Sequence, residues 1–388
     1  MTRKKPVTSP PVVMAPRADG FEIVWGVERL SRGWIEWHSG DASGVARADA
    51  FGLTPQSDRV LRVRLGGFAA GDSIRFRAVT EAIAGPSARH ESEWKQVRTL
   101  DPDADGAHIA VWNDTHERGA TLRKLDEVTP PVDMLLWNGD LCNDWKKEDA
   151  FTRTVLAPEG LDISDGRPLS IVLGNHDVRG TWAYQLAEYV AMPEQRPYSA
   201  ARIGPVAFVQ LHTGEDKPDD HPTFKGRVAF EPLRAEQAEW LRDATARPEI
   251  RDAPYRIVFC HIPLRWIDET PADYDRGGYD WFSRMSRDAW HDALAEWGAQ
   301  LVISGHTHEP AFLEATAEFP YAQLVAGGPH PSPKNAEAAT WTEISTGDGE
   351  LVLTTRHLDG TVVFDTRLAP IATTSPIATT SPTEKDAL

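Results

Sequence analysis

Five short polar motifs, each preceded by an apolar run, contain the side chains of this chain that can do chemistry. They are Asp114-Thr-His116, Gly139-Asp140-Leu-Cys-Asn143, Gly174-Asn175-His176-Asp177, His261 and Gly305-His306-Thr-His308. Carboxylate, amide and imidazole groups together suit divalent ions such as Mn²⁺, Fe²⁺ and Zn²⁺. The motifs offer more such ligands than one tetrahedral ion needs, which favours two metals that share a bridging carboxylate.

The elements that must position these motifs are indicated by the apolar runs. Buried strands are expected at 108–112, 133–137, 169–173, 206–211, 255–260 and 301–304, with helices at 233–244 and 287–297 between some of them. This alternation predicts a layered α/β domain. Open α/β sheets bind ligands at the carboxyl ends of their strands, so the five motifs are expected to meet in one crevice. The later runs 321–326, 351–356 and 361–367 lack intervening helices and are expected to finish a second sheet.

The chain divides by pattern into five parts. Residues 1–10 are expected to be a flexible N-terminus, and 11–100 show period-two alternation between turns, which is typical of a fibronectin-like or immunoglobulin-like β-sandwich. The acidic segment 101–106 is expected to be a linker, and 107–368 the catalytic domain. Residues 369–388 contain a repeated polar stretch that cannot bury apolar area, which predicts a disordered tail.

Composition excludes several classes of protein. The 388 residues carry a formal net charge of −17, which argues against general nucleic-acid binding, and no run is apolar enough for membrane insertion. Two cysteines exclude a disulfide framework. The basic N-terminus is not followed by the apolar stretch of a signal peptide, so a cytoplasmic protein is expected, with export by another route as the alternative. The oligomeric state stays open.

The ordered set of motifs closely resembles the calcineurin-like metallophosphoesterase family over about residues 106–330. The N-terminal sandwich and the run Glu236-Gln-Ala-Glu-Trp240-Leu further resemble purple acid phosphatases, which carry a fibronectin-type domain before the same catalytic fold. The resemblance implies two β-sheets flanked by helices. It also implies the metal ligands: Asp114, His116 and His308 for one ion, Asn175, His261 and His306 for the other, and Asp140 as the bridge.

Three further residues are candidates for substrate chemistry. In the family pattern His176 stands beside a ligand and faces the substrate as a proton donor or a phosphate contact. An imidazole in general titrates at about pH 6.5, so a histidine beside the metals can protonate a leaving oxygen. Asn143 is expected to orient that ring. Arg265, in a segment after His261, is expected to contact the substrate phosphate.

One position departs from the pattern of purple acid phosphatases. Those proteins place a tyrosine three residues after the bridging aspartate, where it binds ferric iron and gives the colour. Here that position is Asn143. The departure predicts an all-divalent pair of Mn, Fe or Zn, and no purple centre.

The function that these features imply is a dinuclear metal-dependent phosphoester hydrolase, in which a metal-held hydroxide attacks a small-molecule phosphoester. Monoesters and diesters both stay open as substrates, because both need the same two ions. The alternative is a non-catalytic metal-binding scaffold on a phosphoesterase fold. The complete ligand set favours the enzyme.

Overall fold

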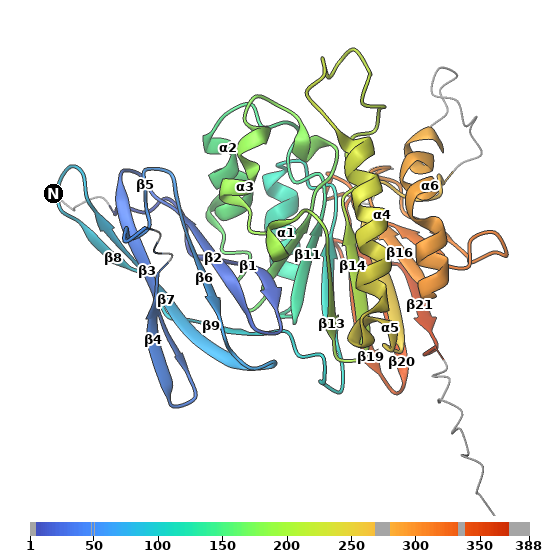
Figure 1. Ribbon diagram of the computed structural model, residues 1–388, viewed down its shortest axis with the longest axis horizontal. Coiled ribbons are helices and arrows are strands. Elements are labelled where there is room, and N and C mark those ends of the chain that lie inside the picture. Colours follow the sequence, from blue (N-terminus) through green and yellow to red (C-terminus); the bar gives the residue numbers. More distant parts are fainter. Residues whose placement is uncertain (1–4, 48, 50, 268–279, 333–337, 372–388) are drawn as a thin grey trace, which may run out of the picture.

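The computed structural model describes residues 5–47, 49, 51–267, 280–332 and 338–371. Figure 1 shows the N-terminal strands at one end of the molecule and helices α4 (Phe230–Ala246) and α6 (Asp280–Trp297) at the other. Between them lie α1 (Gly119–Val128), the short α2 (Asp149–Phe151) and the short α3 (Leu186–Tyr189). The described strands form three sheets. An all-β part before an α/β domain is the predicted fold class, which is confirmed.

A nine-stranded sheet runs through the molecule and carries three of the motifs. In spatial order its strands are β21 (Val362–Leu368), β20 (Glu350–His357), β19 (Thr340–Gly347), β10 (His108–Trp112), β11 (Met134–Asn138), β12 (Leu169–Val172), β1 (Val12–Arg17), β2 (Gly20–Gly26) and β6 (Val60–Gly66). Strands β10, β11 and β12 are parallel, so their carboxyl ends lie at one edge. The expectation that 351–356 and 361–367 finish a second sheet was wrong, because β20 and β21 extend this first sheet from β19.

A second, six-stranded sheet faces the parallel part of the first. Its spatial order is β13 (Ser199–Ile203), β14 (Val206–Leu211), β15 (Tyr255–Cys260), β16 (Leu301–Ser304), β18 (Ala322–Val325) and β17 (Ala311–Leu313). Helices α4 and α6 and the short α5 (Pro248–Arg251) cover its outer face, where Leu241, Ile250 and Trp290 are buried. The two sheets therefore form the central layers of a helix–sheet–sheet–helix arrangement.

Successive side chains of the central strands point alternately into two different hydrophobic cores. On β10, Ile109 and Val111 point into the core between the two sheets, whereas Ala110 and Trp112 pack toward the helices on the other face. This period of two is what a strand buried on both faces requires. Each large apolar side chain fully buried in this way contributes about 1.5–3 kcal/mol.

The third sheet belongs to the N-terminal part. It orders β4 (Ala42–Ala46), β3 (Ser31–Ser39), β7 (Ser73–Ala82) and β8 (Arg89–Glu91), with β5 (Gln56–Ser57) on β3 and β9 (Lys95–Arg98) on β7. Its apolar face packs against β1, β2 and β6, and Phe21, Trp25 and Phe76 are buried between the layers. These layers form the predicted β-sandwich.

The sandwich and the catalytic layers share one sheet. Strand β1 pairs in parallel with β12 through Met14 and Leu169, so hydrogen bonding continues across the predicted division at 101–106. Met14 is buried with Trp137 and Phe151 of the catalytic part. The division of the chain into separate units stays a prediction, and the structure shows that β-pairing crosses it.

Parts of both predicted flexible ends are described. Within the predicted flexible N-terminus, Val7 bridges to Val27, and the Thr8 N–H donates to the Gly26 carbonyl at 2.9 Å. Most of the predicted disordered tail, residues 372–388, lies outside the described residues. Among the described residues, no helix has the length and apolarity needed to cross a membrane.

Candidate metal centre

All five motifs begin where a central strand ends. Asp114 follows β10, Asp140 follows β11 and Asn175 follows β12, all in the nine-stranded sheet, while His261 and His306 follow β15 and β16 of the facing sheet. Because the carboxyl ends of these strands lie at the same edge of the two layers, residues as far apart in the sequence as His116 and His308, which are separated by 192 positions, become neighbours. The structure thus brings the seven candidate ligands into one cluster.

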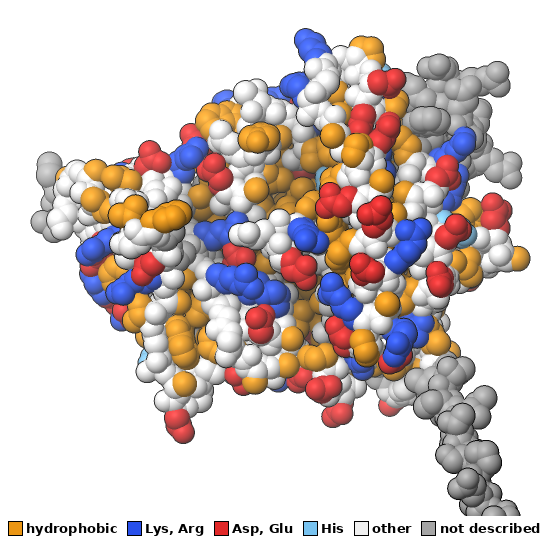
Figure 2. Space-filling view, in the orientation of Figure 1, with side chains coloured by type: hydrophobic (Ala, Val, Ile, Leu, Met, Phe, Trp, Pro, Cys, Tyr) orange, Lys and Arg blue, Asp and Glu red, His pale blue; other side chains and the backbone are white. Residues whose placement is uncertain are grey.

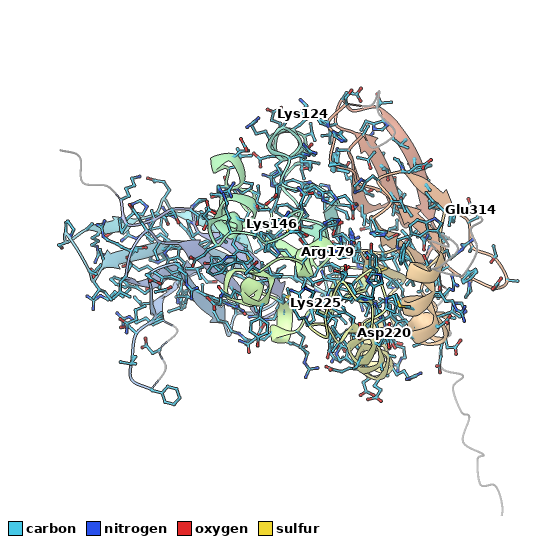
Figure 3. The ribbon with its side chains drawn as sticks, turned by 90° about the horizontal axis from the view of Figure 1, so that it is seen from above. Lys124, Lys146, Arg179, Asp220, Lys225 and Glu314 are labelled. Atoms are coloured by element: carbon cyan, nitrogen blue, oxygen red, sulfur yellow. The ribbon has the colours of Figure 1, made fainter. Side chains whose placement is uncertain are left out.

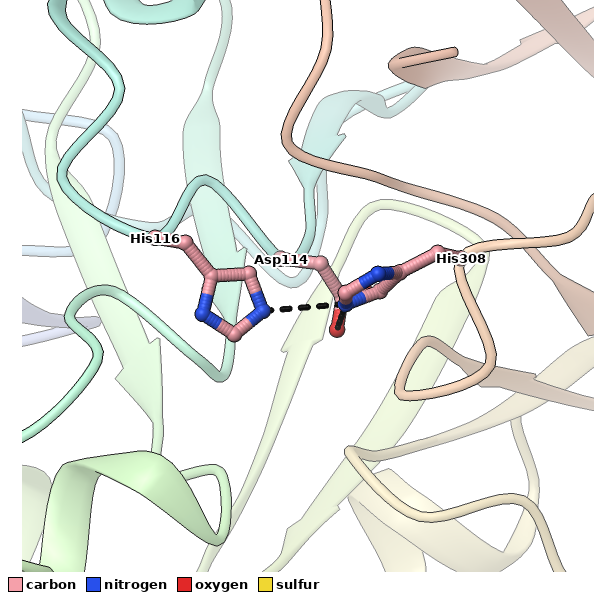
Figure 4. A group of neighbouring side chains, drawn as sticks. All are labelled: Asp114, His116 and His308. Atoms are coloured by element: carbon pink, nitrogen blue, oxygen red, sulfur yellow. Dashed lines mark hydrogen bonds and ion pairs between the residues drawn. The ribbon is translucent and has the colours of Figure 1, made fainter. Parts of the chain in front are cut away.

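The first group of ligands is Asp114, His116 and His308 (Figure 4). His116 Nε2 lies 2.9 Å from His308 Nε2, and His308 Nε2 lies 3.5 Å from Asp114 Oδ1. Asp114 is fully buried, His116 is 6% exposed, and the His308 side chain is 22% exposed. Three donor atoms therefore point at one small volume that opens toward solvent on the His308 side.

The second group is Asp140, His261 and His306, with Asn175 beside it. His261 Nε2 lies 3.2 Å from Asp140 Oδ2, and His306 Nδ1 lies 2.9 Å from Asn175 Oδ1. The same Asp140 Oδ2 is 3.6 Å from His116 Nε2 of the first group. Asp140 therefore lies beside both groups, as the predicted bridging role requires.

The backbone at the cluster is held in an uncommon conformation. Asp114, His116, Asp140, His306 and His308 all have φ between 46° and 73°, in the left-handed region that side chains with a Cβ rarely adopt. Such strain is typical of functional sites. Two glycines allow the close approach: a Cβ on Gly174 would lie 2.2 Å from Asp140 Oδ1, and one on Gly305 would lie 2.2 Å from Asp114 Oδ2.

The electrostatics of the cluster favour a cation at its centre. Burial would raise the pKa of Asp140, but the charge and close contact of His261 together with the charges of His116 and His176 outweigh burial and hold this pKa far below its usual range. Burial lowers the pKa of His261, and the carboxylates of Asp140 and Asp114 overcome it and raise the pKa to about 10. Without a metal, a proton on His261 is thus what balances the two buried carboxylates.

The donor atoms fit divalent ions. His261 Nε2 is buried, makes no hydrogen bond and faces Asp140 Oδ2 at 3.2 Å, so it can serve as a metal ligand. Neither Cys142 nor Cys260 is a candidate ligand, because burial raises the pKa of both thiols and keeps them protonated. Imidazole and carboxylate donors around buried negative charge are the set that Mn²⁺, Fe²⁺ or Zn²⁺ would take.

Residues 107–310 match the family model described as "Calcineurin-like phosphoesterase". The chain belongs to this family. The human protein named "Serine/threonine-protein phosphatase CPPED1" is a relative of this phosphoesterase, 25% identical over 261 residues. The matched region is 61% of this chain and 78% of the human protein.

Two solved structures share the fold of the phosphoesterase. A purple acid phosphatase, PPD1, from yellow lupin (Lupinus luteus) seeds has a TM-score of 0.69 at 13% identity, covering 92% of this chain and 74% of its own. PhoD has a TM-score of 0.61 at 10% identity, covering 91% of this chain and 87% of its own. At these identities the likeness concerns the fold alone. It extends beyond the matched family region into the N-terminal β-part.

His176 of the phosphoesterase lies against the cluster, with a ring nitrogen close to donor atoms of His116 and Asp140. His176 Nδ1 is 2.5 Å from the Asn143 carbonyl oxygen, and because a carbonyl only accepts, Nδ1 carries the proton. Asn143 thus contacts the ring through its backbone, whereas its side-chain amide donates to the His116 carbonyl at 3.3 Å. A proton-donor role for His176 requires a second proton on Nε2.

Arg179 is a site residue that sequence reasoning missed. Its Nη1 donates to His176 Nε2 at 3.3 Å, and its other nitrogens donate to Glu215 and Asp216. Figure 3 shows Arg179 near the centre of the molecule in the view from above. One signal was available, because residues three apart in a helical turn share a face, and Arg179 follows the turn His176–Val178.

The structure places Arg265 in a different environment. Its Nη1 donates to the Glu314 carbonyl at 2.9 Å, and its guanidinium carbon lies 4.8 Å from the Phe319 ring centroid. These contacts hold the guanidinium against the segment that follows β17. Its contact with a substrate phosphate stays a prediction.

Asp177, the last residue of its motif, supports the loops instead of facing the ligands' donor atoms. Its carboxylate accepts the N–H groups of Leu141 at 3.0 Å and Gly174 at 2.9 Å. It thereby ties the loop after β11 to the loop after β12. Burial and the nearby Asp140 carboxylate raise its pKa to about 7.

Proposed function

We propose that this protein is a dinuclear, divalent-metal-dependent phosphoester hydrolase. The observation that carries the proposal is the position of Asp140 between two groups of ligands, each completed by side chains from both sheets. Two bound divalent ions would lower the pKa of water and neutralise charge on the phosphoryl oxygens. They would also let a chain of net charge −17 accept an anionic substrate.

The residues of the chain take separate roles in the proposal. Asp114, His116 and His308 would hold one ion, Asn175, His261 and His306 would hold the other, and Asp140 would contribute to both sites. His176 carries a proton to the leaving oxygen from Nε2, while the Asn143 carbonyl keeps the ring oriented through Nδ1. Arg179 supplies a positive charge beside the phosphoryl group, and its hydrogen bond to Nε2 has to break when Nε2 takes up a proton, because a protonated nitrogen cannot accept.

The comparisons support an enzyme over a scaffold. The human relative is named a phosphatase, and the seven predicted ligands of this chain lie in one cluster. A phosphatase name favours monoesters over diesters as substrates of this chain. The side chains around the cluster serve both reactions, so turnover has to decide between them.

The experiment uses protein stripped of metal and reloaded with Mn²⁺, Fe²⁺ or Zn²⁺ in separate samples. Turnover of 4-nitrophenyl phosphate is compared with that of bis(4-nitrophenyl) phosphate, and bound metal is measured by elemental analysis. We expect up to two ions per chain and hydrolysis that depends on them, faster for the monoester.

Two variants complete the experiment. Asp140→Asn is expected to abolish turnover and weaken both metal sites. Asp149→Asn is the matched control, because Asp149 is exposed on α2 and pairs only with Arg153 among the ion pairs found. A protein that binds two ions and hydrolyses neither ester would establish the scaffold instead.

A further inference from the structure

A cleft of about 970 Å³ lies next to the metal-binding cluster. One wall comes from the segment 178–197 that follows the Gly-Asn-His-Asp motif, and the other from residues 215–230, which lead into α4. Arg179 lines the cleft and also donates to His176 Nε2 at 3.3 Å. Arg179 therefore connects the lining of the cleft to the proposed proton-carrying side chain.

Most of the cleft surface is apolar. The larger apolar side chains that line it are Leu173, Val178, Leu186, Met192, Phe224 and Phe230. Figure 2 shows apolar side chains gathered in the hollow between the α3 region and α4. At the rim, Tyr184 is 98% exposed, which leaves an aromatic ring uncovered beside the opening. Apolar lining with an exposed aromatic ring is suited to a ring-containing ligand.

The charged side chains of the cleft do not favour a cationic ligand. Its two carboxylates are already engaged, since Asp177 accepts backbone N–H groups and Glu215 binds Arg179. Arg179 and Arg227 are the cationic residues of the lining, and Arg227 Nε donates to the Phe224 carbonyl at 2.9 Å. An apolar group, neutral or anionic, therefore suits the cleft.

The N-terminal sandwich holds one wall of the cleft in place. Arg59 Nη1 donates to Gln185 Oε1 at 3.3 Å, and Arg62 Nη1 donates to the Ala187 carbonyl at 3.0 Å. Arg59 Nη2 also lies 3.1 Å from Glu188 Oε2. A wall fixed before binding lowers the ordering cost of a ligand.

We propose that this cleft binds the alcohol part of the substrate, and that this part is bulky and apolar, as in a phosphate ester of an aromatic alcohol. The inference rests on the proposed function, because it places the phosphoryl group at the metals. Ligand clefts of roughly 300–1,000 Å³ hold drug-sized molecules, far larger than a phosphate group. The volume beside Arg179 is therefore room for the rest of the ester.

The first test compares phenyl, 2-naphthyl and 4-biphenylyl phosphate, whose leaving groups have similar acidity but increasing apolar area. With the metal-loaded protein we expect KM to fall by about tenfold or more from phenyl to biphenylyl phosphate, while kcat stays within about threefold. Equal KM values for the three esters would overturn the proposal and leave the hydrolase function intact.

The second test measures binding without catalysis. Binding of 4-phenylphenol and of phenol to the metal-free protein is followed by titration calorimetry, and we expect measurable binding of 4-phenylphenol only. This result separates the two proposals, because the cleft can bind the alcohol even if no ester is hydrolysed. Absence of 4-phenylphenol binding, together with equal KM values, would exclude the cleft as an alcohol site.

Two variants in which tryptophan replaces alanine test whether 4-phenylphenol binds in the cleft. Ala187→Trp fills the cleft from the α3 wall and keeps the backbone carbonyl that Arg62 binds. Ala235→Trp adds the same side chain to an exposed position of α4 that does not line the cleft. We expect Ala187→Trp to weaken 4-phenylphenol binding at least tenfold and to raise KM for biphenylyl phosphate, with KM for phenyl phosphate within threefold. The same loss in Ala235→Trp, or none in Ala187→Trp, would contradict the assignment.

Discussion

Glu215 binds Arg179 through two parallel hydrogen bonds, with Arg179 Nε at 2.7 Å from Oε1 and Nη2 at 2.6 Å from Oε2. Glu215 is 1% exposed, and Asp216 adds a third contact to Nη2 at 2.9 Å. A guanidinium held at several nitrogens has one orientation, which leaves Nη1 facing His176. The loop after β14 thus controls a residue beside the metal cluster.

This relationship predicts that Glu215→Gln lowers kcat more than metal affinity. The amide keeps one acceptor oxygen but loses the charge, so Arg179 is held less firmly. We expect kcat/KM for an alkyl phosphate to fall about tenfold, equivalent to about 1.4 kcal/mol. Metal content, measured by elemental analysis, should not change. Glu239→Gln, exposed on α4, is the control, and an equal effect there would contradict the role.

His176→Ala should separate substrates by leaving group. The ring touches the cluster without belonging to the predicted ligand set, so bound metal is expected to stay normal. Loss of a general acid should slow esters of poor leaving groups by about 10²–10⁴-fold and esters of nitrophenol much less. Steady-state rates for an alkyl and a nitrophenyl phosphate provide the comparison. An identical loss for both esters would argue against proton donation.

Because position 143 is asparagine and not tyrosine, we expect the iron-loaded protein to lack the purple colour. The side chain at this position donates to the His116 carbonyl and offers no phenolate to a ferric ion. The visible spectrum of air-exposed, iron-loaded protein should therefore lack an intense charge-transfer band. A strong band near the middle of the visible range would show that another residue supplies a phenolate.

His212 should make stability depend on pH between about 4 and 6.5. Burial lowers the pKa of this histidine to about 4. The unfolded chain, with a histidine pKa near 6.5, binds the proton more tightly in this window, so the free energy of unfolding falls as pH decreases through it and is unaffected above it. Between pH 7.5 and 5.0 the expected loss from this group is about 2 kcal/mol.

The check for His212 is urea unfolding of wild type and His212→Asn at both pH values. Asparagine cannot take up the proton, and its amide can donate to the Leu173 carbonyl, which accepts from His212 Nδ1 at 3.2 Å. The variant should therefore lose about 2 kcal/mol less than wild type on acidification. An unchanged difference between the two pH values would rule out His212 as the source.

A chain that begins at Asp101 should be unstable. Such a chain lacks β1, so the edge of β12 would be uncovered. It also lacks Val12, Met14, Ala15 and Val24, which belong to a core shared with the catalytic part. Lost burial of these side chains costs roughly 5 kcal/mol or more. Size-exclusion chromatography and thermal unfolding should show aggregation or a lower Tm, whereas a chain lacking only 372–388 serves as the control. A monomer with unchanged Tm would contradict this prediction.

Features that depend on neighbouring residues in the sequence, such as the positions of strands, could be predicted from the sequence. Strand β15 was predicted at 255–260 and β16 at 301–304, because each apolar run ends at a polar residue of a motif. Strand β12 was predicted one residue too long, at 169–173. The candidate ligands follow directly from those strand ends, so their meeting in one cluster could also be anticipated.

Features that depend on distant partners could not be predicted in the same way. Periodicity identifies a strand but not its neighbour, and so the runs that became β20 and β21 were assigned to the wrong sheet. Arg179 and Glu215 are far apart in sequence and meet only because β12 and β14 lie in facing sheets. The contact of Asn143 with His176 uses a backbone carbonyl, which every residue type possesses.

A left-handed backbone lowers folding stability at five predicted metal ligands, which are Asp114, His116, Asp140, His306 and His308. In the proposed function the same five residues are needed for activity. At each of these positions glycine would relieve strain of about 1 kcal/mol or more and remove a predicted metal ligand. If selection acted on folding stability alone, glycine would therefore be expected to replace these residues at the ends of β10, β11 and β16. If descendants of this protein keep aspartate and histidine at these positions, this would indicate continued selection for metal binding and hydrolysis.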